Sequence, residues 1–243
     1  MKNYLLGGAL LLAALLPLTP ASAQKVKIKQ KAGAAPIPDA ARRMLPLYGG
    51  VSTAEAERLA GPAILADATR SFASRAEASR FFSDKGFEYL QENQPDTAMY
   101  RFNLAWALDP RNPDAFRGQA VVLSQREAAP TEILPLLQQG LVLAPDNAAL
   151  LGDLGTLQLL QFNTSKKKRD LTDAVTTLER AVQFQPANAS AWSQLARAYY
   201  HQEKYPQAWE AVHNTQKYNM AMLDFGLISE LLAKQPDPQG KFK

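Results

Sequence analysis

Cysteine is absent from this 243-residue chain, and histidine occurs only at His201 and His213. The absence of cysteine excludes a disulfide framework, a thiolate metal site and a cysteine nucleophile. The two imidazoles lack the His-x-x-x-His spacing that holds a catalytic zinc ion, and there is neither a Gly-rich phosphate loop with Lys nor a Gly-x-Ser-x-Gly elbow. The sequence therefore predicts no catalytic residues, no metal site and no cofactor, and it indicates that the protein is not an enzyme.

The first 23 residues have the order of a signal peptide. Lys2 supplies positive charge, an apolar run extends from Tyr4 to Leu16, and Ala21 and Ala23 form a small-x-small cleavage pattern. The run is shorter than the ~20 residues that a membrane-spanning helix needs. We expect cleavage before Gln24 and export to the periplasm or envelope of a bacterium. Retention of the segment as an uncleaved anchor is the alternative.

Residues 24–50 contain an excess of basic side chains. Lys25, Lys27, Lys29 and Lys31 alternate with other residues near the start of this range. Such an alternation can form an amphipathic edge strand, but no partner strand follows it. We therefore predict a flexible basic arm over 24–50, followed by helices over 51–78.

Internal repetition is the strongest pattern in the chain. Pro110, Pro145 and Pro186 each follow the end of an apolar helical stretch, and each precedes an asparagine by two residues. Proline prevents a helix from continuing, and asparagine caps the next helix through its side-chain oxygen. The spacing of the prolines predicts helix-turn-helix units of about 34 residues.

Aligned on these prolines, the units resemble tetratricopeptide repeats (TPRs) in residue type as well as in length. The first unit has the bulky, small and aromatic residues of the family pattern at Phe82, Gly86, Tyr89, Ala98, Phe102, Ala105 and Pro110. The fourth unit has Trp192, Leu195, Ala196, Tyr199, Tyr205, Ala208 and Val212. The stretch from Asp96 to Trp106 is similar to exported bacterial TPR proteins in particular. The resemblance implies an all-α fold, a right-handed TPR superhelix (α-solenoid) of about four repeats.

We expect the repeats to have the following bounds. They are 79–112 for the first, 113–147 for a degenerate second, 148–188 for a third with a basic insertion, and 189–222 for the fourth. A C-terminal capping helix over 223–235 and a flexible tail over 236–243 complete the chain.

The resemblance also implies where a partner binds, because the first helix of each TPR lines the concave face. The side chains expected to face this groove are Arg80, Ser83, Phe87, Gln91, Arg117, Val121, Gln125, Gly152, Thr156, Leu159, Ser193, Arg197, Tyr200 and His201. The sequence thus predicts an exported scaffold that binds a protein or peptide, with arginine and aromatic side chains as anchors.

A basic insertion at Lys166, Lys167, Lys168 and Arg169 indicates an alternative function. Together with the basic arm, this candidate anion patch would let a cell-envelope component bind anionic polymers or lipid head groups. Nucleic acid is disfavoured as a partner, because the chain is expected to be exported and no aromatic residues interleave with the lysines.

Replacing Lys166, Lys167, Lys168 and Arg169 together by serine should leave the free energy of unfolding nearly unchanged, because these residues lie in an insertion between two helices. Urea denaturation followed by circular dichroism measures the change. A large loss of stability would mean that the insertion supports the fold.

Overall fold

The computed structural model describes residues 37–243, so the signal peptide and residues 24–36 of the predicted arm lie outside the described residues. Within 37–243 all regular secondary structure is helical. The α-helices are α1 (Asp39–Arg42), α2 (Leu47–Gly50), α3 (Thr53–Ala60), α4 (Pro62–Ser71), α5 (Arg75–Gln91), α6 (Pro95–Leu108), α7 (Pro113–Gln125), α8 (Pro130–Leu143), α9 (Ala148–Ser165), α10 (Lys168–Phe184), α11 (Ala189–His201), α12 (Tyr205–Tyr218) and α13 (Phe225–Leu232). A short 3₁₀ helix, Met220–Met222, precedes α13.

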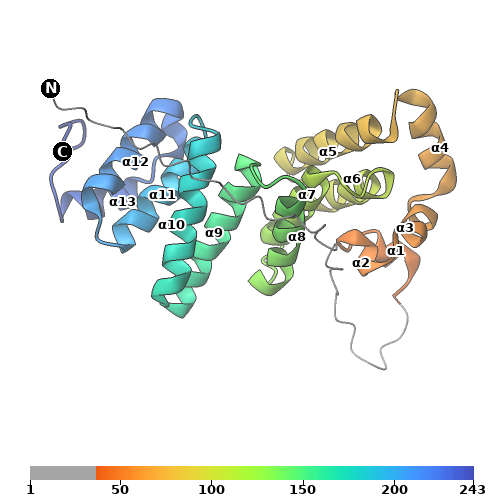
Figure 1. Ribbon diagram of the computed structural model, residues 1–243, viewed down its shortest axis with the longest axis horizontal. Coiled ribbons are helices and arrows are strands. Elements are labelled where there is room, and N and C mark those ends of the chain that lie inside the picture. The colour runs from red at the N-terminus through yellow and green to blue at the C-terminus, as the bar shows by residue number, and fades with distance from the viewer. Residues whose placement is uncertain (1–36) are drawn as a thin grey trace, which may run out of the picture.

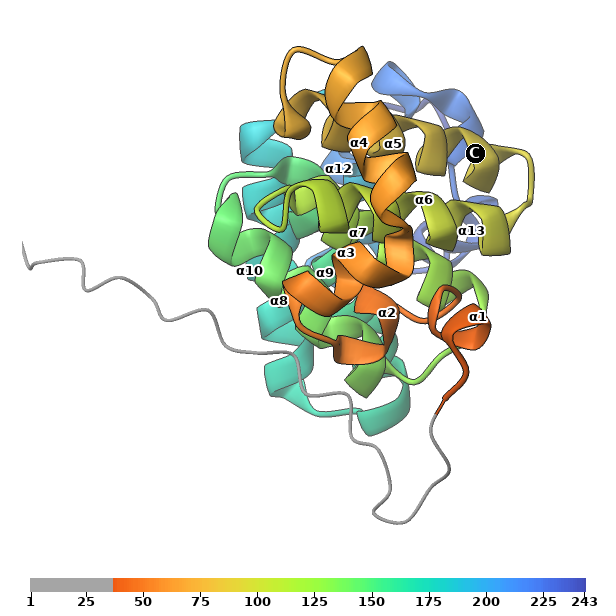
Figure 2. The same ribbon diagram turned by 90° about the vertical axis from the view of Figure 1, so that its right-hand side faces the viewer.

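The helices form a row of hairpins, α5–α6, α7–α8, α9–α10 and α11–α12, that packs side by side from one end of the molecule to the other (Figure 1). Viewed along the row, α3 and α4 lie across its N-terminal end (Figure 2). At the opposite end, α13 packs on α12 and buries Leu227, Ile228 and Leu231. The prediction of an all-α solenoid is confirmed.

Asparagine caps the first helix of the second, third and fourth hairpins, as the repeated Pro-x-Asn pattern predicts. The side-chain oxygen of Asn112 accepts from the Asp114 amide at 2.9 Å, and that of Asn188 accepts from the Ala191 amide at 3.0 Å. Asn147 caps α9 in the same way. These bonds satisfy amides that have no partner within the helix, so each helix begins at a fixed residue.

The hairpins approach closely at glycine. Phe102 of α6 is fully buried between Gly86 of α5 and Gly118 of α7. A Cβ atom at Gly86 would lie 2.5 Å from the Phe102 ring, and one at Gly118 would lie 2.0 Å from it. Both distances are far below van der Waals contact, so the ring occupies the space that a side chain at either position would need.

Residues 37–50 differ from the predicted flexible arm. Leu47 and Tyr48 are buried, both with φ of +52°, and they pack beside α3 and α6. The buried Asn103 amide donates to the carbonyls of Arg43 at 3.0 Å and Leu45 at 2.8 Å. These contacts join the segment to the first repeat, so it is part of the fold.

The C-terminal residues also differ from the prediction of a flexible tail. The side chain of Asp237 accepts from the amides of Gln239, Lys241 and Phe242 at 2.8–3.0 Å. The Phe242 ring stacks on Trp209, with 6.0 Å between the centroids. The tail therefore folds back onto α12 and covers it.

Substituting Gly118 by alanine should lower the free energy of unfolding by about 1–3 kcal/mol, because the added methyl group overlaps the buried Phe102 ring. Thermal denaturation compared with that of the unaltered protein measures the effect.

Gly152 provides a matched control within α9. A Cβ atom there would meet its nearest neighbour at 3.7 Å, an ordinary contact. Alanine at Gly152 should therefore stabilise the protein by about 0.5–1 kcal/mol through its greater helix propensity. Equal melting temperatures for the two variants would contradict the close approach at Gly118.

Candidate interaction groove

The first helices of three successive hairpins, α7, α9 and α11, enclose a hollow of about 260 Å³, here called the inner hollow. Its apolar lining consists of Ala120, Val121, Ile133, Leu137, Leu157 and Leu160. Its polar lining consists of Ser124, Gln125, Asp153, Thr156, Ser190 and Gln194. The floor comes from buried residues of α7, α8 and α9, so the same packing that forms the core fixes the shape of the hollow.

The inner hollow presents aliphatic carbon and uncharged hydrogen-bonding groups. Leu160 is 55% exposed at its edge, which leaves an apolar side chain available for contact. Asp153 is the one ionisable residue of the lining. Its carboxylate lies 2.7 Å from Nε of Arg117 and is thus already paired. Burial raises the pKa of Asp153 above its ordinary value, and the Arg117 charge opposes that rise.

Arg117 links the inner hollow to the first repeat. Its guanidinium carbon lies 5.0 Å from the centroid of the Phe87 ring, a cation–π distance. Phe87 in turn meets Phe102 edge to face, with 4.9 Å between the centroids. Arg117 therefore connects α5, α7 and α9 at the side of the groove.

Arg197 has a comparable role at the C-terminal end. Its Nε lies 3.1 Å from the carboxylate of Asp224, which also caps α13 by accepting from the Leu227 amide at 3.0 Å. Burial acts to raise the pKa of Asp224. Hydrogen bonds from Arg197 and from the Leu227 and Gly226 amides outweigh burial and hold that pKa below its ordinary value.

The structure brings together only part of the predicted groove. Val121, Gln125 and Thr156 line the inner hollow. Arg117 and Arg197 do not line it, and each is paired with a carboxylate of this chain, Asp153 and Asp224 respectively. Ser193 and Tyr200 are half-buried on α11 and do not line the hollow. The Tyr200 ring instead packs near His201 and Tyr205.

The first repeat departs further from the prediction. Ser83 is buried, and its hydroxyl accepts from the Asn112 side chain at 3.0 Å, so it supports the turn before α7 and does not face a ligand. Phe87 lies beneath Arg117. Arg80 is exposed on α5 and has no partner in the described part of the chain.

The sequence-based set missed several lining residues, among them Asp153, Leu160, Ser190 and Gln194. Leu159, which was expected to face the groove, is 2% exposed and lies in the core. Its neighbour Leu160 faces outward instead. The long α9 helix contains consecutive leucines, and their pattern does not show which of them turns inward.

Half of the predicted basic insertion is helical. Because α9 extends to Ser165 and α10 begins at Lys168, only Lys166 and Lys167 remain in the turn. Lys166 lies 5.6 Å from the Phe162 ring centroid, and Arg169 lies 3.6 Å from the Asp173 carboxylate. All four predicted basic side chains are exposed, and none of them lines the inner hollow.

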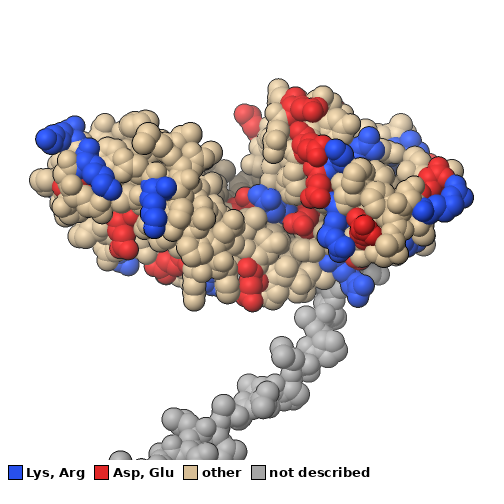
Figure 3. Space-filling view, turned by 90° about the horizontal axis from the view of Figure 1, so that it is seen from above, with Lys and Arg blue, Asp and Glu red and all other residues tan. Residues whose placement is uncertain are grey.

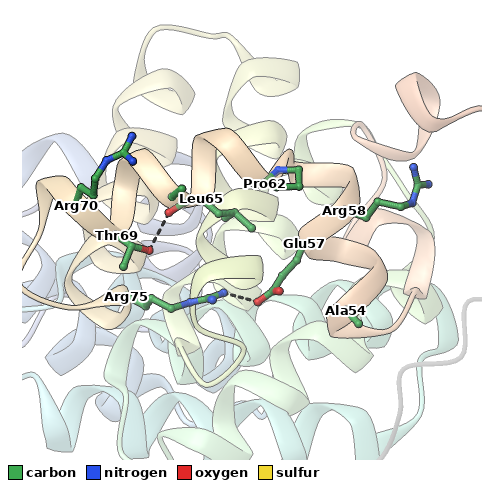
Figure 4. A pocket seen from close by; sticks show the side chains of 9 residues that line it. Ala54, Glu57, Arg58, Pro62, Leu65, Thr69, Arg70 and Arg75 are labelled. Carbon is green, nitrogen blue, oxygen red and sulfur yellow. Dashed lines mark hydrogen bonds and ion pairs between the residues drawn. The ribbon is translucent and has the colours of Figure 1, made fainter.

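A larger hollow of about 600 Å³ lies between α3, α4 and α5 (Figure 4). Across it, Nη2 of Arg75 lies 2.5 Å from the Glu57 carboxylate, and Nε of Arg75 donates to the Leu108 carbonyl at 3.0 Å. Figure 4 shows the side chains of Arg58 and Arg70 directed away from this pair. Arg75 and Glu57 thus tie the N-terminal helices to the first repeat, which is a structural role.

Charge is nearly balanced over the described residues. All 23 Asp and Glu lie beyond residue 36, whereas five of the 27 Lys and Arg (Lys2, Lys25, Lys27, Lys29 and Lys31) precede residue 37. On the face shown in Figure 3, basic and acidic side chains are mixed over the half with the N-terminal helices, and the other half has fewer charges. This face has no continuous basic surface for an anionic polymer.

Residues 37–243 have neither a cluster of metal-binding side chains nor a membrane-spanning helix. No group of three or more His, Cys, Asp or Glu side chains there could hold a metal ion. No helix in this range is both long and apolar enough to cross a membrane.

Several solved structures share the fold. PilF of Pseudomonas aeruginosa is 23% identical over 68% of this chain and 74% of its own, with a TM-score of 0.56. A thermophilic TPR protein of Thermus thermophilus is 15% identical over 64% of this chain and 82% of its own, with a TM-score of 0.55. MamA of Desulfovibrio magneticus is 15% identical over 66% of this chain and 87% of its own, with a TM-score of 0.50. No protein-family model and no curated protein matches the sequence. These similarities show that the chain has the TPR fold.

Replacing Arg117 by glutamine should lower the free energy of unfolding by about 1 kcal/mol at about pH 7, because Asp153 loses its partner and Phe87 its cation. The pair requires an ionised Asp153. The ion-pair part of the difference should therefore disappear as pH falls through the folded pKa of Asp153. At about pH 3 only the smaller, pH-independent contribution of the Phe87 contact should remain.

Arg80→Gln is the matched control, since Arg80 is exposed and unpaired on the neighbouring helix α5. Its stability should stay within about 0.5 kcal/mol of the unaltered protein. Urea denaturation of the three proteins at both pH values measures the effect. An Arg117→Gln loss that is independent of pH would show that packing and not the ion pair is responsible.

Proposed function

We propose that this protein is an exported, non-enzymatic scaffold that binds a segment of a partner protein in the groove formed by α7, α9 and α11. The inner hollow is the observation that supports this proposal. It is a concave site built from rigid helices, and it combines an apolar floor with a few polar groups, as binding sites commonly do.

The lining of the inner hollow defines the chemistry of the partner segment. A volume of about 260 Å³ accommodates one aliphatic or aromatic side chain rather than a whole cofactor. Around it, the amides of Gln125 and Gln194 and the hydroxyls of Ser124 and Ser190 offer hydrogen bonds to a peptide backbone. Because the ionisable lining residue Asp153 is paired with Arg117, an uncharged anchor side chain fits better than a charged one.

A preformed groove keeps the entropic cost of binding low. Arg117 joins α7 to α9, and Arg197 joins α11 to the turn before α13. Both contacts hold the inner helices in place before a ligand arrives. Affinity should therefore depend on the anchor side chain and its pocket rather than on the total contact area.

The proposed export rests on the amino-acid sequence. The positive residue, apolar run and small-x-small pattern of residues 1–23 are typical of a cleaved signal peptide. An exported scaffold of this kind would meet its partner in the periplasm or the cell envelope.

A pocket-filling substitution tests the groove. Peptides selected from a displayed random library on the immobilised protein should lose affinity by about tenfold or more for Thr156→Phe, because the ring occupies the inner hollow. Isothermal titration with the selected peptides measures the dissociation constants.

Thr172→Phe is the matched control. Both threonines are exposed on helices and donate to the carbonyl four residues earlier, Thr156 to Gly152 and Thr172 to Lys168. Thr172 is on α10 and does not line the inner hollow. Peptides that bind both variants equally would contradict the proposed site. Binding that disappears with salt and with serine at Lys166–Arg169 would favour the basic insertion instead.

A further inference from the structure

A second hollow opens on a different face of α11, between α10 and α12, with a volume of about 420 Å³. Here it is called the outer hollow. Ser190 and Gln194 of α11 face the inner hollow, whereas Trp192, Leu195 and Tyr199 face the outer one. The two sites therefore share a helix without sharing a side chain, and the outer hollow has no part in the proposed groove.

The outer hollow combines two aromatic rings with two carboxylates. Trp192 and Tyr199 lie seven residues apart on α11, and Glu179 of α10 and Glu210 of α12 flank them. The indole Nε1 of Trp192 donates to the Pro186 carbonyl at 2.8 Å. The phenol of Tyr199 donates to the Glu179 carboxylate at 2.6 Å. Both rings are thus held in one orientation.

Glu210 completes the site as an unpaired carboxylate. It is exposed and makes neither a hydrogen bond nor an ion pair within residues 37–243. Lys204, which does not line the outer hollow, places its Nζ 5.9 Å from the Tyr199 ring centroid. The Tyr199 ring therefore already has a lysine ammonium group at cation–π distance. The unpaired carboxylate of Glu210 lines the same hollow and adds negative charge to it.

The first repeat shows what such an aromatic pair accepts. Phe82 and Tyr89 of α5 have the same spacing of seven residues as Trp192 and Tyr199. The guanidinium of Arg101 lies 5.9 Å from the Phe82 ring centroid and 5.6 Å from that of Tyr89. In that repeat, a guanidinium supplied by the chain itself lies against both rings.

The fourth repeat lacks an arginine at the equivalent position. Arg101 follows Tyr89 by twelve residues, and the residue twelve positions after Tyr199 is Ala211. Alanine cannot reach the rings, and no lysine or arginine is among the residues that line the outer hollow. Carboxylates of Glu179 and Glu210 flank the rings here, so the electrostatic attraction for a cation is stronger than aromatic rings alone provide.

We propose that the outer hollow binds an arginine side chain of a partner protein. The planar guanidinium stacks on Trp192 and Tyr199, and its N–H groups donate to Glu210 and to the free oxygen of Glu179. Arginine fits better than lysine because it can stack on a ring and bond a carboxylate at the same time. The site adds a charge-selective contact on the face of the solenoid away from the inner hollow.

The test uses a minimal probe, acetyl-Gly-Arg-Gly-amide, whose single charge is the guanidinium. The matched probe replaces arginine by citrulline, which keeps the shape and removes the charge. Each is titrated into the ¹⁵N-labelled protein while the indole N–H signals of Trp106, Trp192 and Trp209 are followed by NMR. The variant Trp192→Phe assigns the reporter signal.

The arginine probe should shift the Trp192 signal in a saturable way and leave the signals of the buried Trp106 and Trp209 in place. The Glu210→Gln variant should bind the probe about fivefold more weakly, since it loses one charge-assisted hydrogen bond. Glu132→Gln, which removes an exposed carboxylate of α8, should bind it unchanged.

Two results would overturn the proposal. The first is a Trp192 signal that does not move with the arginine probe, or that moves equally with the citrulline probe. The second is equal affinity of the Glu210→Gln and Glu132→Gln variants, which would attribute the shift to general screening of negative charge. Neither result depends on whether the inner hollow binds a peptide.

Discussion

The close approach of neighbouring helices at glycine is the constraint on which the rest of the structure depends. Phe102 enters the space left by Gly86 and Gly118, and Leu178 enters the space left by Gly155, where a Cβ atom would lie 2.5 Å away. Each contact fixes both the distance and the register between two helices, because a buried ring or leucine has few alternative rotamers. The spacing of α7 from α6 and of α9 from α10 follows from these contacts. The inner hollow is therefore a product of core packing and not of flexible loops.

Asparagine side chains fix the register of this packing. Asn112 accepts from the Asp114 amide and also donates to the hydroxyls of Ser79 and Ser83, so one side chain both starts α7 and joins it to α5. Buried polar groups are costly when they lose their partners, and a shift of one residue between these helices would break several bonds at once. The repeat pattern places Ser83 among the groove residues. Its buried hydroxyl instead accepts from Asn112 and supports the turn before α7.

The sequence predicted the repeats because their signals are local. Proline, asparagine and glycine act within a few residues of themselves, so their spacing defines the hairpins. Residues 37–50 and 236–243 could not be assigned in this way. The burial of Tyr48 accompanies hydrogen bonds from Asn103 to a segment about 60 residues earlier, and the position of Phe242 depends on Trp209. In the groove, the lining residues Val121, Gln125 and Thr156 were predicted from their positions in the repeats. The partners of Arg117 and Arg197 come from the next repeat and the capping segment, and no position pattern specifies them.

The inner and outer hollows differ in their electrostatics. In the groove, the charges beside the inner hollow are neutralised within the protein, so recognition there depends on shape and uncharged hydrogen bonds, which salt screens little. On the outer face, Glu210 has no internal partner within residues 37–243, and the arginine that fills the equivalent place in the first repeat is replaced by Ala211. The two repeats share their geometry, but the fourth lacks the arginine of the first, and the unpaired charge of Glu210 is one that a second molecule can neutralise. A single partner that reached both faces of α11 would bind through two contacts of different chemistry, and linking them would raise its affinity above that of either contact alone.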